Sequence, residues 1–117
     1  MIGLFGNRRT VVTFPDGSGF PDGMCIDADG MLWVAMYFGS VIYRVDPLTG
    51  TIIRNIDLPV SCPTSCCFGG ENFDVLYVTS ASHFFSEEQL AKEPLAGSVF
   101  QVTNLGVTGL PANAYGG

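Results

Sequence analysis

"LWVA" at residues 32–35 and "LYVT" at residues 76–79 are two versions of the same apolar segment, 44 positions apart. Likewise, "GSVI" at residues 39–42 resembles "GSVF" at residues 97–100, but 58 positions separate this second pair. The larger offset indicates an insert near residues 82–96 of the second copy. A period of about 40 to 50 residues built from short strands is typical of propeller blades or a similar array.

The first copy predicts four strands joined by tight turns. Asp29-Gly30 is a hairpin pair, and "DPLTG" at residues 46–50 turns the chain again. The early strands are apolar on both faces, and polar alternation grows along the unit, as in a blade whose inner strands are covered by neighbouring blades. We therefore expect one blade at about residues 21–58, with its strands at residues 24–27, 31–37, 41–46 and 51–58.

The second copy predicts a last blade, at about residues 63–103, that lacks its closing strand. The insert carries the only helical signal, with Ser86 as N-cap and two glutamates after it, so helix should be confined to about residues 86–92. The fold class is all-β, and residues 1–117 are expected to form a partial β-propeller of two stacked antiparallel sheets. The strands of the second sheet are expected near residues 64–68, 75–80 and 98–103.

The composition excludes several classes of protein. Hydrophobic residues make up 47% of the 117 residues and charged ones only 14%, which excludes a disordered chain. The net charge of −6 argues against nucleic acid or an anionic membrane surface as a partner, and no apolar run reaches membrane-spanning length. The start, "MIGLFGNRRT", lacks the order and length of a signal peptide, so a cytoplasmic location is expected.

The cysteines and the single histidine do not suggest a structural metal site. No C-x-x-C motif occurs, and His83 has no carboxylate or thiol partner at a useful spacing, so a position at the surface or at a rim is expected for it. Trp33 is expected to pack between blades. Buried free thiols, which fit a reducing compartment, are expected for all four cysteines: Cys25, Cys62, Cys66 and Cys67.

The tripeptide Pro-Asp-Gly occurs twice, at residues 15–17 and 21–23. Proline presets φ, aspartate tolerates the bend and glycine takes a positive φ, so the tripeptide is turn chemistry. From the tripeptide alone, Asp16 and Asp22 are both plain turn residues. Two turns so close together leave open whether either aspartate has a further role.

Five motifs in order carry a family resemblance: "PDGMCIDADGMLWVA", "YRVDPLTG", "TSCCFGG", "LYVTSA" and "AGSVFQVTNLGVTG". From about Arg8 onward, the chain resembles the C-terminal part of the family of regucalcin (senescence marker protein), gluconolactonase and luciferin-regenerating enzyme. The resemblance implies a six-bladed propeller with a divalent metal in its central channel, of which this chain would be about the last two blades. It also implies that a strand from the beginning of the whole propeller completes the last blade.

The same resemblance implies a site residue. In the family, the aspartate of Pro-Asp-Gly-Met binds the metal and is taken as the general acid/base, and the match here is Asp22. A carboxylate suits a hard cation and can take a proton from water beside it; calcium, zinc, manganese and magnesium all remain open. Asp16 matches no family ligand and is expected to be a flexible turn. The family's other ligands, a glutamate and an asparagine, have no counterpart in this chain.

Three functions compete on these grounds. The first is the C-terminal part of a metal-dependent lactone hydrolase that converts a sugar lactone to an aldonic acid, with Asp22 as catalytic residue and metal ligand. The second is a non-catalytic, calcium-binding regulatory propeller, and the third is a truncated, inactive chain. Because two blades cannot close a ring, exposed blade faces and a free strand edge predict self-association, and the chain is not expected to be competent alone.

Overall fold

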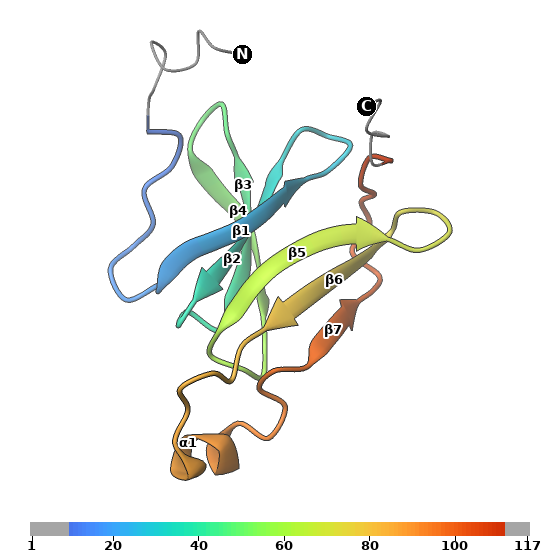
Figure 1. The fold of residues 1–117 in the computed structure, drawn as a ribbon. Helices are drawn as coiled ribbons and strands as arrows, with labels where there is room; N and C mark the ends of the chain where they lie inside the picture. Colours follow the sequence, from blue (N-terminus) through green and yellow to red (C-terminus); the bar gives the residue numbers. More distant parts are fainter. Residues whose placement is uncertain (1–9, 112–117) are drawn as a thin grey trace, which may run out of the picture.

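The structure, a computed structural model, describes residues 10–111, which form two antiparallel sheets and one short helix (Figure 1). The strands of the first sheet follow chain order: β1 (Phe20–Ile26), β2 (Leu32–Tyr37), β3 (Val41–Asp46) and β4 (Thr51–Asp57). The second sheet contains β5 (Pro63–Gly69), β6 (Val75–Ser80) and β7 (Val99–Val102). Helix α1 (Glu87–Lys92) lies in the connection from β6 to β7.

These elements confirm the all-β prediction of two antiparallel sheets. One boundary was predicted wrongly: β1 begins at Phe20, so the second Pro-Asp-Gly tripeptide lies inside a strand and is not a turn. The second sheet has three strands within residues 10–111, and the chain after β7 pairs only through an isolated bridge between Asp27 and Gly109. The helix begins as predicted, because the Ser86 side chain accepts a hydrogen bond from the Gln89 N–H at 3.1 Å.

The two sheets pack against each other through a shared apolar core. Trp33 is fully buried there, and its ring meets the ring of Phe68 edge-on at a centroid distance of 5.6 Å, so the expected position between the sheets is confirmed. Figure 1 shows β5 lying across β1 and β2. The buried residues of this core come from both sheets: Trp33, Ala35, Ile42, Cys66, Leu76, Val78 and Leu105.

A second core covers the opposite face of the first sheet, which the sequence predicted to be exposed. Val12 and Phe14, which precede β1, pack on this face, and the Phe14 ring stacks on Tyr43 with centroids 5.6 Å apart. The segment before β1 therefore covers part of this face of the first sheet. The buried residues beneath are Val34, Met36, Val41 and Val45.

A buried ion pair joins Asp27, the residue directly after β1, to Arg44 on β3. Asp27 is fully buried, and its carboxylate accepts hydrogen bonds from Trp33 Nε1 and Arg44 Nε, each at 2.8 Å. Its other oxygen accepts from the backbone N–H groups of Asp29 and Met31 at 2.9 and 3.0 Å. Burial raises the pKa of Asp27, but these hydrogen bonds outweigh it, so the pKa lies below its ordinary value. The predicted hairpin pair Asp29-Gly30 thus lies in a turn that the Asp27 carboxylate holds by hydrogen bonds.

The cysteines are free thiols, as predicted, but they are not all buried. Cys62 and Cys66 are buried, Cys25 is half-buried, and Cys67 is exposed because its neighbour Cys66 faces the core. Cys25 and Cys66 lie on facing strands of the two sheets, with their sulfur atoms 3.7 Å apart. Within residues 10–111, no helix has the length and apolar character needed to cross a membrane.

Candidate functional site

Asp22 lies at an irregularity in the ladder between β1 and β2. Pro21 pairs with Met36, but Met24 pairs with Val34, so β1 holds one extra residue between these pairs. An extra residue bends its strand and turns side chains away from the regular pleat. Among the described residues, no hydrogen bond or ion pair reaches the exposed Asp22 carboxylate, which leaves its oxygens available to a ligand.

The glycine of this tripeptide serves close packing and not a turn. A Cβ on Gly23 would lie 2.3 Å from the Ser65 hydroxyl oxygen and 2.8 Å from the Thr64 carbonyl oxygen. Only glycine therefore allows β1 to approach β5 this closely. The approach places the Asp22 segment beside the start of the second sheet.

The second sheet repeats the irregularity in the corresponding place. Pro63 pairs with Ser80 and Ser65 with Thr79, which again leaves one extra residue, Thr64, on the inner strand. The Thr64 hydroxyl lies 2.7 Å from the hydroxyl of Thr79. The residue after the proline therefore finds a partner in its own sheet here, whereas Asp22 does not.

Asp16 lies in a turn, in contrast to Asp22. The Ser18 N–H donates to the Pro15 carbonyl at 3.1 Å, and Gly17 has a φ of 84°, in the left-handed region that favours glycine. A Cβ on Gly17 would meet nothing within 4 Å, so this turn projects into open space. The two tripeptides thus share a sequence but not a conformation.

The described residues do not by themselves form a metal centre. No three histidine, cysteine, aspartate or glutamate side chains of residues 10–111 come together in a way that could hold a metal ion. Asp22 is a suitable oxygen ligand, but a single carboxylate falls short of the coordination that calcium or zinc takes in proteins. Residues 10–111 can contribute one ligand, and any further protein ligands must come from outside this range.

Tyr37, the last residue of β2, lies at the same end of the first sheet as Asp22. Its neighbours on β1 are Phe20 and the irregular segment that carries Asp22. Burial raises the pKa of Tyr37, and the nearby Cys62 thiol and the Asp22 carboxylate raise it further. The phenol is therefore a neutral hydrogen-bonding group at neutral pH.

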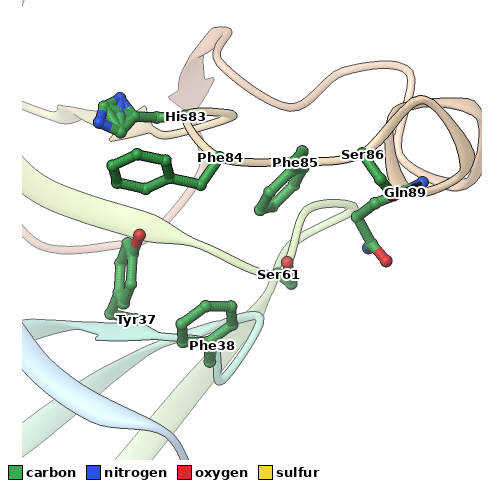
Figure 2. A pocket seen from close by; sticks show the side chains of 8 residues that line it. All are labelled: Tyr37, Phe38, Ser61, His83, Phe84, Phe85, Ser86 and Gln89. Carbon is green, nitrogen blue, oxygen red and sulfur yellow. Dashed lines mark hydrogen bonds between the residues drawn. The ribbon is translucent and has the colours of Figure 1, made fainter.

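Beside Tyr37 lies an open cavity of about 590 Å³ (Figure 2). One wall comes from the end of β2 and the turn after it, and the other from the insert before α1. In Figure 2 the rings of Phe84 and Phe85 face those of Tyr37 and Phe38, and His83 lies at the rim. His83 is exposed, in the rim position expected from the sequence.

Two phenylalanines in this cavity adopt a backbone conformation that their side chains disfavour. Phe38 has a φ of 65° and Phe84 a φ of 67°, one on each wall. Glycine or asparagine ordinarily takes such positions, and a bulky residue there costs about 1–3 kcal/mol. Both rings are also largely exposed, at 56% for Phe38 and 95% for Phe84, so burial does not offset this cost.

The insert is held across the cavity by its own anchor. The Glu93 carboxylate, just after α1, accepts a hydrogen bond from the Ser61 N–H at 2.6 Å, and the Gln89 side chain donates to it as well. Burial raises the pKa of Glu93, but the hydrogen bonds from Ser61 and Gln89 lower it more, so the carboxylate stays charged at neutral pH. This contact fixes the aromatic wall of the insert opposite Phe38.

Sequence reasoning named Asp22 and His83 but missed the cavity between the two aromatic walls. The walls, residues 37–38 and 83–86, are too far apart in the sequence for a local pattern to join them. The run "HFF" at the start of an insert rich in charged residues was the available signal. It could have been recognised as an exposed aromatic group that serves no core.

Two stacked antiparallel sheets that repeat one strand pattern define the chain as a protein of β-propeller type. Residues 2–82 match the family model described as the SMP-30/Gluconolactonase/LRE-like region. The chain therefore belongs to the SMP-30/gluconolactonase/LRE-like family.

Curated relatives agree with this assignment over nearly the whole chain. Regucalcin of Gallus gallus is 49% identical over 115 residues, which are 98% of this chain and 38% of the chicken protein. Regucalcin of Homo sapiens is 46% identical over the same share of each chain. The chain thus spans about 38% of the length of the curated relatives it matches.

Solved structures show the same fold. A luciferin-regenerating enzyme superposes with a TM-score of 0.78 at 37% identity, and the match covers 87% of this chain and 34% of that one. Regucalcin from Agrobacterium tumefaciens, described as a calcium-binding protein, superposes with a TM-score of 0.79 at 25% identity over the same shares.

Proposed function

We propose that this chain supplies one metal ligand and the proton-accepting carboxylate, both Asp22, to a lactone hydrolase of gluconolactonase type. The observation that carries the proposal is the position of Asp22: exposed, at an extra residue of β1, with no described side chain bound to it. The matching Thr64 position, whose hydroxyl is paired with Thr79, offers no such group. The substrate class is a sugar lactone, and the metal is a divalent cation such as calcium.

Asp22 acts in this proposal as a base. An exposed carboxylate can take a proton from water as the water attacks the lactone carbonyl, and it can return the proton to the leaving oxygen. A bound divalent cation supplies charge stabilisation to the carbonyl oxygen. The remaining ligands and the sugar-binding groups lie outside residues 10–111, so the chain alone should not turn over a lactone.

A chimera tests the assignment. The part of chicken regucalcin that matches this chain is replaced by this chain, and native chicken regucalcin is assayed beside it. Gluconolactone hydrolysis is followed by proton release, and calcium binding by calorimetry. Asp22→Asn should reduce hydrolysis about 100-fold or more, because a positioned base contributes at least that factor, and should weaken calcium binding.

Asp16→Asn is the matched control. Asp16 also lies between a proline and a glycine, but in an exposed turn. This substitution should leave both hydrolysis and calcium binding unchanged. Hydrolysis that survives Asp22→Asn in the chimera would refute the catalytic assignment. Metal-dependent hydrolysis by the 117-residue chain alone would refute the view that the site is incomplete.

A second candidate function is calcium binding without turnover. It is favoured by the calcium-binding description of the Agrobacterium regucalcin, whose fold this chain shares. In that case the chimera binds calcium in an Asp22-dependent way but does not hydrolyse gluconolactone. The same two measurements therefore separate the two functions.

A further inference from the structure

We propose that the cavity between Tyr37, Phe38 and the insert is a binding site for a neutral, planar aromatic small molecule. Its volume of about 590 Å³ falls within the range of about 300–1,000 Å³ typical of small-molecule sites. This site is separate from the metal and proton chemistry proposed for Asp22. Its occupant is defined by the chemistry of the lining alone.

The lining selects for a flat apolar ring. Four aromatic side chains face each other across the opening, two from each wall, and such rings bind a planar molecule by offset stacking or edge contacts. The four are Tyr37, Phe38, Phe84 and Phe85.

The polar groups of the cavity select for a neutral molecule. No carboxylate, lysine or arginine belongs to the lining residues. The groups that can hydrogen-bond a polar substituent are neutral hydroxyls and one imidazole: Tyr37, Ser61, Ser86 and His83. The Gln89 side chain is already engaged with Glu93.

The backbone gives an independent reason to regard the rings as functional. Strained conformations persist where the side chain is needed at that place, and they cluster at binding sites. Phe38 and Phe84 combine left-handed φ values of 65° and 67° with large exposed fractions, so neither ring is kept for the core. An occupant that covers both rings explains why phenylalanine stands where glycine would fold more easily.

The test measures binding of 2-naphthol, a neutral planar probe, to the 117-residue chain by equilibrium dialysis in the presence of EDTA. Phe84→Gly and Phe38→Gly should each weaken binding about fivefold, the factor expected for losing one ring-to-ring contact. Neither variant should lower the urea midpoint of unfolding, because glycine relieves the left-handed backbone at both positions. A role in folding would instead make binding and midpoint fall together.

Phe73→Gly is the matched control. Phe73 also has a left-handed φ, of 54°, but it lines a different apolar cavity, of about 640 Å³, beside Phe68 and Leu110. Its replacement should leave 2-naphthol binding unchanged. Loss of binding in Phe73→Gly alone would place the probe in that other cavity and overturn the proposal. Unsaturable binding, binding that survives all three changes, or a midpoint lowered in both wall variants would overturn it as well.

Discussion

Replacing Asp27 with asparagine should cost the fold about 3–5 kcal/mol. The buried carboxylate accepts two backbone N–H groups on one oxygen and the Trp33 and Arg44 donors on the other. In Asp27→Asn the first oxygen remains, but an NH₂ group faces two donors in place of the second. Two hydrogen bonds to a charged group are lost, at about 1.5–3 kcal/mol each, and breaking a buried ion pair costs about 3–5 kcal/mol in all.

In Asp27→Asn, the Arg44 guanidinium has few other contacts that could replace the lost carboxylate. Its side chain is 16% exposed, and its other partner is Asp29, which is 67% exposed and 3.1 Å away. Domains of this size have a free energy of unfolding of about 5–15 kcal/mol, so the change removes a large share of it. Asp29→Asn is the matched control and should cost less than about 1 kcal/mol, because an exposed ion pair contributes little.

Urea unfolding, followed by circular dichroism and by the fluorescence of the single Trp33, measures both variants. All samples need one fixed protein concentration, since association adds concentration-dependent stability. Because the Asp27 pKa is lowered in the fold, its contribution is present above the ordinary value of 3.8 and is lost as the pH falls through the lower folded value. The gap between wild type and Asp27→Asn should therefore shrink in acid. A midpoint shift no larger than that of Asp29→Asn would refute the assigned role.

Three further predictions concern the contact between the sheets and the exposed surface. Gly23→Ala should destabilise the fold by about 1–3 kcal/mol, because its Cβ would lie 2.3 Å from the Ser65 hydroxyl oxygen. In urea unfolding, Ser65→Gly should restore only part of the loss, because the Thr64 carbonyl oxygen at 2.8 Å remains. A hydrogen bond from the Cys66 thiol lowers the pKa of Cys25. Cys66→Ala should therefore raise the pKa of Cys25 and slow its alkylation by iodoacetamide at neutral pH, measured by mass spectrometry of the peptide that contains Cys25. An unchanged alkylation rate would count against the hydrogen bond between the two thiols. The isolated chain should associate or bind hydrophobic dyes through exposed side chains such as Phe20 and Val99, and a dilute, dye-free monomer in analytical ultracentrifugation would contradict this.

Most of the strand pattern was predictable from local chemistry. Residues 41–46 and 75–80 are bounded by turn residues on both sides, so the apolar pattern and the turn residues indicate the same strand ends. The observed strands β3 and β6 coincide with the prediction. The start of β1 was missed because proline and glycine disfavour a regular strand. The extra residue at this place lets Pro21 and Gly23 remain inside the ladder.

The contacts that depend on tertiary structure were harder to predict from the sequence. Asp27 was predicted only as the last residue of a strand. Its partner Arg44 lies on β3 and reaches it only once β2 and β3 are in register. The exposure of Cys67 could have been inferred, since adjacent strand residues face opposite sides and Cys66 is the buried one. The aromatic cavity depends on two phenylalanines that oppose their backbone preference, so propensity argued against it.

The repeated irregularity after Pro21 and Pro63 has an evolutionary consequence. A residue that stands outside the cross-strand pairing can be exchanged without changing the backbone register of the pairs beside it. One duplicated unit carries Asp22 at this place and the other carries Thr64, although both sheets keep the same ladder. Each of the two sheets thus has one position at which the side chain differs while the backbone pairing is the same. Divergence of the two copies can therefore add or remove a charged group at this place by substitution of a single residue.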